Sequence, residues 1–319
     1  MAEVVCLGEV LIDFVPTVTP TTLIEAPAFK KAPGGAPANV AVGLARLGIG
    51  SAFLGMTGDD PFGHFLEQTL REAGVDTRWL RFTADARTAL AFVSLRADGE
   101  REFTFYRHPS ADMLLRPEDV DAAAFTNAKV LHVGSISLIA EPSASATRVA
   151  LARARAAGCL ISCDPNLRLA LWPDPEAARA GLLEAVAAAD VVKISDDELN
   201  FLFGTDDPAE ARSHLLAPHH RLIVITYGAR GCVWLTHSAE GRLPGFVVEA
   251  VEATGAGDGF TAGLLAGLLD RPDAPLHDAR LDAICRFACA VGAITTTVRG
   301  AIPALPDRAT VERFLEQHG

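Results

Sequence analysis

The chain has few cysteines, few basic residues and no long apolar run. Six cysteines are spread over 319 residues without a C-x-x-C pair, so we expect buried, reduced thiols and no disulfide framework. The spacing of four in Cys159/Cys163 and in Cys285/Cys289 leaves a metal site as the alternative. Lys and Arg number 28 against 40 Asp and Glu, a net charge of −12 that argues against broad contact with nucleic acid.

Hydrophobic patterning gives no sign of a membrane protein. The apolar run GLLAGLL is followed at once by DRPDAP, so it is too short to span a bilayer. The start, MAEVVCLGEVLIDF, has no charged region ahead of a long apolar segment and no small-residue cleavage site. We therefore expect a cytoplasmic protein with small-molecule partners, and its 50% hydrophobic content is enough for a large core.

Short β-branched segments alternate with alanine- and leucine-rich segments of helical spacing. The expected strands are VVCLGEV, KVLHVG, CLISCD, DVVKIS and RLIVIT, and the expected helices include ANVAVGLARLG, FGHFLEQTLREAG and EAARAGLLEAVAAA. The first two helices should stop at Gly48 and Gly74. Apolar strands that alternate with helices indicate a parallel sheet covered on both faces, hence an α/β fold, which we expect to form one domain over residues 1–319.

One segment departs from this alternation. Residues 87–107, RTALAFVSLRADGEREFTFYR, have the period-two pattern of two strands around Asp98-Gly99, which is typical of a β-hairpin. We expect this hairpin, joined by part of residues 14–33, to form a flap or lid. A plain edge hairpin is the alternative.

Glycines and polar residues follow each expected strand. They are Gly8, Glu9 and Asp13; Gly134 and Ser135; Asp164, Asn166 and Arg168; Ser195 to Glu198; Gly228 and Gly231; and, after VVEAVEA, Thr254 and Asp258. Each has a local explanation as a turn or cap residue. Because parallel strands end at the same edge of a sheet, where ligands bind in such folds, we expect these residues to form one site.

The stretch EATGAGDGFTAGLLAGLL, residues 252–269, places a glycine-rich turn and Asp258 before a buried helix that begins near Gly257. Such a turn leaves backbone N–H groups unpaired at the positive end of the helix dipole, which attracts phosphate. Asp258 would then accept the proton of an attacking hydroxyl, while these N–H groups stabilise charge on the phosphate. The dipole should keep this base ionised near neutral pH. The pattern indicates phosphoryl transfer to a hydroxyl.

Two other phosphate-binding motifs are the alternatives to this prediction. No G-x-x-x-x-G-K-[ST] occurs, so the chain has no P-loop. GDGFTA, residues 257–262, matches the relaxed dinucleotide pattern G-x-G-x-x-A, but the following AICRFACAVGAITTT has a helical pattern where a dinucleotide fold needs a strand. A dinucleotide-dependent dehydrogenase is therefore a minor alternative.

PGGAPANVAVGLARLG near the N-terminus and TGAGDGFTAG near the C-terminus resemble the two signatures of the ribokinase-like (PfkB) carbohydrate kinases. GEVLID, GDDPFG, FYRHPSADMLL, GSISL, DPNLR and KISDDEL resemble its bacterial fructokinase branch. The resemblance implies a three-layer αβα sandwich with a mostly parallel central sheet and a small β-lid. It also implies ATP as co-substrate, Mg²⁺, and a sugar hydroxyl as acceptor, with fructose to fructose 6-phosphate as the first hypothesis. The alternatives are 2-keto-3-deoxygluconate kinase, ribokinase, nucleoside kinase and an inactive sugar-binding regulator.

The resemblance also implies a role for individual residues. The catalytic centre would comprise Asp258 with Gly255, Ala256 and Gly257. Sugar contacts would come from Asp13, Gly34, Gly35, Asn39, Phe105, Arg107 and Arg168. ATP would meet Lys193, Thr226, Gly228, Gly231 and Thr254.

Two positions differ from the family pattern. The N-x-x-E element that binds Mg²⁺ through water has Ser195 for its asparagine, so only Glu198 is carried over. Glu252 replaces the usual aspartate of a monovalent-cation site, which leaves K⁺ dependence open. Related kinases often dimerise through the lid, and apolar residues on the hairpin suggest a homodimer here. They are Leu90, Phe92, Phe103 and Phe105.

Overall fold

The computed structural model describes residues 2–18, 20–95, 101–272 and 274–318. Within these residues a nine-stranded sheet has the order β13-β12-β11-β10-β9-β8-β1-β4-β5. Its strands are β1 (Val4–Leu7), β4 (Ser51–Gly58), β5 (Asp76–Thr83), β8 (Val130–Val133), β9 (Leu160–Cys163), β10 (Val191–Ser195), β11 (Leu222–Thr226), β12 (Cys232–Leu235) and β13 (Glu240–Leu243). All neighbours pair in parallel except the two pairs made by β12, so the expected parallel sheet is confirmed.

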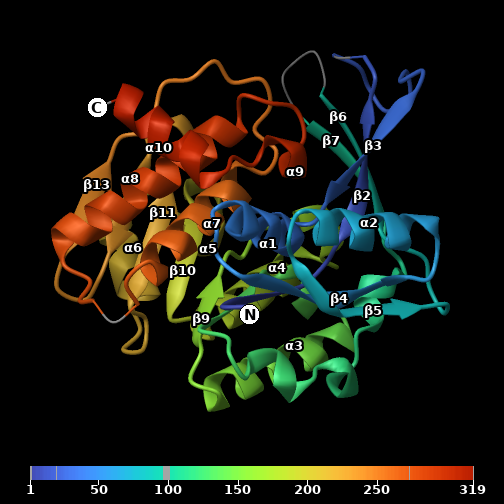
Figure 1. Ribbon diagram of the computed structural model, residues 1–319, viewed down its shortest axis with the longest axis horizontal. Coiled ribbons are helices and arrows are strands. Elements are labelled where there is room, and N and C mark those ends of the chain that lie inside the picture. Colours follow the sequence, from blue (N-terminus) through green and yellow to red (C-terminus); the bar gives the residue numbers. More distant parts are fainter. Residues whose placement is uncertain (1, 19, 96–100, 273, 319) are drawn as a thin grey trace.

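Helices cover both faces of this sheet (Figure 1). One face carries α1 (Ala36–Arg46), α2 (Pro61–Glu72), α7 (Ala256–Leu269), α8 (Asp278–Thr295), α9 (Ala301–Ala304) and α10 (Arg308–Gln317). The other carries α3 (Ser143–Ala156), α4 (Pro175–Ala187), α5 (Asp196–Phe203) and α6 (Pro208–Leu215). Strand β1 shows why two layers are needed: Val5 and Leu7 pack into one apolar cluster, whereas Val4 and Cys6 pack into the other.

Local signals in the sequence explain where the helices begin and end. Helices α1 and α2 are followed by Gly48 and Gly74, both with positive φ, as expected. Asp60 caps α2 by accepting from the N–H groups of Phe62 and Gly63. The 3₁₀ turns between these elements are η1 (Ala111–Leu114), η2 (Pro117–Asp119), η3 (Ala122–Phe125), η4 (Ile136–Leu138), η5 (Leu169–Leu171) and η6 (Gly228–Arg230).

A separate four-stranded sheet projects from the body of the molecule (Figure 1). Its order is β3 (Phe29–Gly34), β2 (Leu11–Pro16), β6 (Leu90–Leu95) and β7 (Arg101–Tyr106). Strands β6 and β7 pair antiparallel, as the hairpin pattern predicts, although the expected turn at Asp98-Gly99 lies outside the described residues. The pairing of β2 with β3 and β6 joins the hairpin to residues 11–34.

The expected strand at VVEAVEA is wrong, since residues 247–253 form no strand. Val247 is 95% exposed, so the apolar alternation here does not mark a buried face. The N–H groups of Val251 and Glu252 donate to the carbonyl of Thr296 after α8, not to a sheet neighbour. The loop that leads into α7 is therefore held by the end of α8.

The cysteines and the apolarity of the helices also bear on expectations from the sequence. The six cysteines are free and buried, as expected, and no cluster of three or more His, Cys, Asp and Glu in the described residues could hold a metal ion. In the same part of the chain, no helix combines the length and apolarity needed to cross a bilayer.

Candidate active site

A cavity of about 450 Å³ lies between the small sheet, the N-terminus of α7 and the ends of the central strands. Twelve of the residues proposed from the sequence line it: Asp13, Gly35, Asn39, Phe105, Arg107, Arg168, Lys193, Glu252, Thr254, Gly255, Gly257 and Asp258. Six do not: Gly34, Ala256, Glu198, Thr226, Gly228 and Gly231. The structure therefore brings part of the expected site to one cavity and leaves the rest outside it.

The glycine turn opens α7 as expected. Gly255 is the N-cap with φ of +81°, and a Cβ at this position would lie 2.7 Å from the Cβ of Ala301. Glycine is required here both by the backbone conformation and by this close approach. The N–H groups of the first turn of α7 lie beside the cavity and suit an anion.

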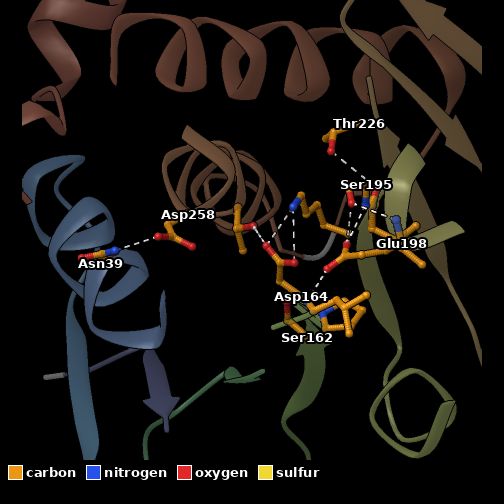
Figure 2. Close-up of polar contacts among 12 residues, drawn as sticks. Asn39, Ser162, Asp164, Ser195, Glu198, Thr226 and Asp258 are labelled. Carbon is orange, nitrogen blue, oxygen red and sulfur yellow. Dashed lines mark hydrogen bonds and ion pairs between the residues drawn. The ribbon is translucent and has the colours of Figure 1, made fainter. Parts of the chain in front are cut away.

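Asp258 is 8% exposed and accepts a hydrogen bond of 2.7 Å from Nδ2 of Asn39 on α1 (Figure 2). Burial raises the pKa of Asp258 to about 6, although the hydrogen bond from Asn39 opposes this shift. The carboxylate is therefore mostly ionised at neutral pH, which is the state that a general base requires. Burial thus opposes the effect of the helix dipole, which favours the ionised carboxylate.

Asn39 has one amide atom without a partner. Its Oδ1 is buried and accepts no hydrogen bond from the described residues, while its Nδ2 is held by Asp258. Asn39 is only 4% exposed and lines the cavity. Because a buried acceptor without a donor is costly, this oxygen indicates a place for a ligand hydroxyl.

A buried ion pair lies at the other side of the glycine turn. Nζ of Lys193 is 3.0 Å from Oδ2 of Asp164, which also accepts from Thr261 at 3.2 Å. Burial favours a lower pKa for Lys193, but Asp164 and Glu198 outweigh it, so the pKa is raised and the ammonium stays charged. A Cβ on Gly257 would lie 3.2 Å from Nζ of Lys193, so the positive charge borders the turn directly.

Two glycines shape the opposite wall of the cavity. Gly34 pairs with Leu11 across β2 and β3, and a Cβ on it would overlap the carboxylate of Asp13. Gly35 has φ of +108°, and its Cβ would lie 2.5 Å from the carbonyl oxygen of Glu9. Burial raises the pKa of Asp13 to about 7, with Arg168 opposing the shift. Both glycines thus allow carboxylate-bearing segments to approach the cavity.

Arg107 has a different set of partners from the one expected. It is buried at the end of β7, where its Nε donates to Oδ2 of Asp112 at 2.8 Å and Nη2 contacts the same oxygen. Ser110 donates to the other oxygen of Asp112. Arg107 borders the cavity, but its guanidinium anchors the small sheet to η1, whereas Phe105 lies on the cavity face of β7.

Glu198 lies outside the cavity because it caps α5. Its Oε2 accepts from the N–H and hydroxyl of Ser195, and its Oε1 accepts from the N–H of Leu167 at 2.7 Å. The serine that replaces the family's asparagine is therefore the other half of a capping box. Figure 2 shows Glu198 close to Asp164, on the side of the site toward Thr226.

The residues expected at the nucleotide lie at the same sheet edge, beyond the cavity. Thr226 ends β11, and its hydroxyl contacts the carbonyl of Ile194 at 3.5 Å. Gly228 and Gly231 frame the turn η6, and both have positive φ. Thr254 stays with the cavity because it precedes the α7 turn.

Three acidic residues near the cavity had no assigned role in the sequence-based prediction. Asp112 and Asp164 each hold a buried cation, and Glu9 accepts from the N–H of Ala36 at 2.9 Å. Burial raises the pKa of Glu9 to about 7, which Arg107 opposes. Glu9 and Asp164 directly follow the central strands β1 and β9, and this position in the sequence indicates a residue at the site. Asp112 follows β7, an edge strand of the small sheet, so its position gave no such indication.

Glu252 contacts the loop that leads to α9. Its Oε2 accepts from the N–H of Gly300 at 3.1 Å, and both residues line the cavity. The side chain at the predicted monovalent-cation position thus reaches the loop at Gly300. Arg299, beside Gly300, adds a cation to this wall.

Comparison with known proteins fits this geometry. Residues 1–308 match the pfkB family carbohydrate kinase model. The chain is 53% identical over 315 residues to "Probable fructokinase-7" of Arabidopsis thaliana, covering 98% of this chain and 92% of that one. The ATP-bound fructokinase structure from Xylella fastidiosa matches with a TM-score of 0.89 and 37% identity, over 100% and 99% of the two chains.

A fructokinase double mutant from Vibrio cholerae O395, solved with fructose, ADP and potassium ion, matches with a TM-score of 0.88 and 39% identity. The alignment covers 99% of this chain and 98% of that one. The resemblance seen in the two glycine-rich signatures is therefore confirmed over nearly the whole chain, and so is the ribokinase-like fold. The chain belongs to the pfkB family of carbohydrate kinases.

Proposed function

We propose that this enzyme transfers the γ-phosphoryl group of ATP to fructose and forms fructose 6-phosphate. The observation that carries the proposal is the Asn39–Asp258 pair, a buried ionisable base beside a glycine turn in a cavity large enough to hold a monosaccharide. The fructokinase names of its relatives favour fructose over ribose, 2-keto-3-deoxygluconate and nucleosides.

Asp258 would accept the proton of the attacking hydroxyl. The backbone N–H groups of Gly255 and Gly257, together with the ammonium of Lys193, would stabilise charge on the transferring phosphoryl group, whereas the N–H of Ala256 already donates to the carbonyl of Ala253. Since such transition states are loose, positioning by Asn39 matters as much as basicity.

Asp13, Asn39 and Arg168 would bind sugar hydroxyls, with Gly34 and Gly35 allowing close approach and Phe105 covering the ring. Arg107 would act through Asp112 by fixing the base of the small sheet, which we expect to serve as a lid over the single kinase domain. The unpartnered Oδ1 of Asn39 supports a hydroxyl donor at this wall.

ATP would extend from the cavity toward Thr254, Thr226, Gly228 and Gly231. Mg²⁺ keeps several waters and takes few protein ligands, so the oxygens of Asp164 and Glu198, already partly satisfied, suit contact through water. When bound with ATP, Mg²⁺ would neutralise phosphate charge. K⁺ would lie between Glu252 and the loop at Gly300. The carboxylate of Glu252 is available there, although one of its oxygens also accepts from the N–H of Gly300.

The homodimer stays a prediction, although its expected patch changes. Leu90 and Phe92 lie on one face of the β6–β7 hairpin. Phe105 pairs with Ala91 and lies on the opposite face, so it does not share a surface with Leu90 and Phe92. The side chain of Phe103 lies outside the described ones. Light scattering at micromolar concentration tests the dimer, and a monomer would contradict it.

The function is tested by ADP release with MgATP and fructose, ribose, 2-keto-3-deoxygluconate, glucose, tagatose or adenosine, each with and without K⁺. We expect fructose to have the highest kcat/KM. Preference for another sugar would overturn the substrate assignment. Sugar binding by calorimetry without ADP release would instead indicate a regulator.

A further inference from the structure

Glu9 is a buried carboxylate that the proposed chemistry does not use. It follows β1, is 4% exposed and lines the cavity together with Asp13 and Asn39. Its Oε1 accepts a hydrogen bond of 2.9 Å from the N–H of Ala36, the first residue of α1. The carboxylate is thus held in a fixed position at the wall of the cavity.

Its surroundings do not satisfy a full negative charge. An ionised carboxylate has about four acceptor sites, and burying it is costly unless donors fill them. The backbone N–H groups of Ala36 and of Glu9 itself are neutral donors, and the cation that acts on Glu9, Arg107, directs both Nε and Nη2 to Asp112. A carboxylate retained in this setting, and bordering a cavity, points to a donor that comes from the ligand.

The position of Glu9 relative to Asp258 suggests which donor. Glu9 binds α1 at Ala36, and Asp258 binds α1 at Asn39, three residues later on the same face. These two points of attachment are separated by about 4.5 Å along the helix. The two carboxylates therefore border one cavity from the two ends of a single helical turn, so one sugar can reach both through different hydroxyls.

We propose that Glu9 is a specificity-determining residue that accepts a hydrogen bond from a sugar hydroxyl other than the one that is phosphorylated. The enzyme would reject sugars that lack this hydroxyl or present it with the wrong configuration. This inference rests on the proposed fructokinase function.

The test compares fructose with analogues that each lack one non-reacting hydroxyl, in the wild type and in Glu9→Gln. Glutamine keeps an acceptor for Ala36, but its amide group cannot accept from the sugar. In the wild type we expect one analogue to lose about 10- to 100-fold in kcat/KM relative to fructose, as for a hydrogen bond to a charged group. In Glu9→Gln this one penalty should shrink about tenfold, with the penalties of the other analogues and the KM for ATP unchanged.

Glu176→Gln, the same change on an exposed residue of α4, is the matched control and should leave all ratios unchanged. If Glu9→Gln does not fold by circular dichroism, Glu9→Asp replaces it, because withdrawing the carboxylate by one methylene must reduce the same penalty. Equal penalties in variant and wild type would overturn the inference while leaving the fructokinase assignment intact. A wild type that does not phosphorylate fructose would overturn both.

Discussion

The sugar side of the candidate site (Asp13, Asn39 and Asp258) lines the cavity and contains the Asn39–Asp258 hydrogen bond, whereas its nucleotide side (Thr226, Gly228 and Gly231) consists of strand-end turns outside the cavity. Asn39 and Asp258 are buried and hold each other in place, while Gly228 is exposed. Buried, mutually held side chains can discriminate between similar hydroxyls. Backbone turns suit phosphates, which need charge and N–H donors more than shape. We infer that changes on the sugar side alter catalysis and specificity sharply, and that changes on the nucleotide side act more weakly.

The largest effect is expected from Asp258→Asn. The amide cannot accept the proton of the attacking hydroxyl, so kcat should fall about 10²- to 10⁴-fold. Stopped or coupled assays of ADP release measure the loss, and thermal unfolding checks the fold. Asp278→Asn, an exposed change in the first turn of α8, is the control and should retain wild-type turnover. Turnover near normal in Asp258→Asn would remove the base from this residue.

Gly34→Ala also tests the sugar side and should have a smaller effect than Asp258→Asn. The added methyl group overlaps the carboxylate of Asp13, so this side chain must move away from the sugar. We expect the KM for fructose to rise about 10-fold, as when one hydrogen bond to a charged group is lost, with a smaller change in kcat. Gly34 lacks the positive φ that strains an alanine, so the effect of Gly34→Ala comes from the overlap; Gly158→Ala, which meets no atom within 4 Å but has positive φ, shows what strain alone would do. An unchanged KM for fructose would mean that Asp13 does not bind the sugar.

The pH dependence should also come from the sugar side. Burial raises the pKa of Asp258 to about 6 and those of Asp13 and Glu9 to about 7. Asp258 must be ionised to accept a proton, and Asp13 and Glu9 accept hydrogen bonds from sugar hydroxyls more strongly when ionised. Activity is therefore present above these values and is lost as the pH falls through about 7 and then about 6. We expect kcat/KM for fructose, at saturating MgATP, to fall by more than about tenfold per pH unit below both values, since more than one proton is taken up. A profile that is flat through this range would contradict the assignment of these carboxylates.

Much of the sheet and the catalytic turn could be predicted from the sequence because both depend on local pattern. Apolar strands and helical stripes repeat along the chain, and the glycines around Asp258 mark a helix start whatever packs against it. The loop at 247–253 shows where this approach fails. Its alternating residues have the pattern of a strand, but its hydrogen-bond partner lies after α8, a contact that local pattern does not encode.

The partners of charged residues were the other missing part. Arg107 lines the cavity and stays a candidate sugar contact, but its pairing with Asp112, five residues later in η1, could not be predicted from the sequence. Glu198 stays the candidate Mg²⁺ residue, but the donors that hold its oxygens, from Ser195 and Leu167, could not be predicted either. In both cases the residue type indicated a buried charge, while the neighbour that neutralises it depends on how the following turn folds.

The smallest effect is expected from Thr226→Ala, which tests the nucleotide side. The hydroxyl has one weak contact, with the carbonyl of Ile194, so its removal should leave the fold unchanged. Because water can replace the hydroxyl at this turn outside the cavity, loss of its hydrogen bond to a phosphate should raise the KM for ATP only about three- to tenfold, with the KM for fructose unchanged. Thr205→Ala is the control, since that hydroxyl accepts from the N–H of Asp207 in an exposed turn away from the cavity. If Thr226→Ala lost as much kcat as Asp258→Asn, the distinction between the two sides would not hold. Such a loss would mean that the nucleotide turn positions the reacting phosphate as strictly as the buried carboxylates position the sugar.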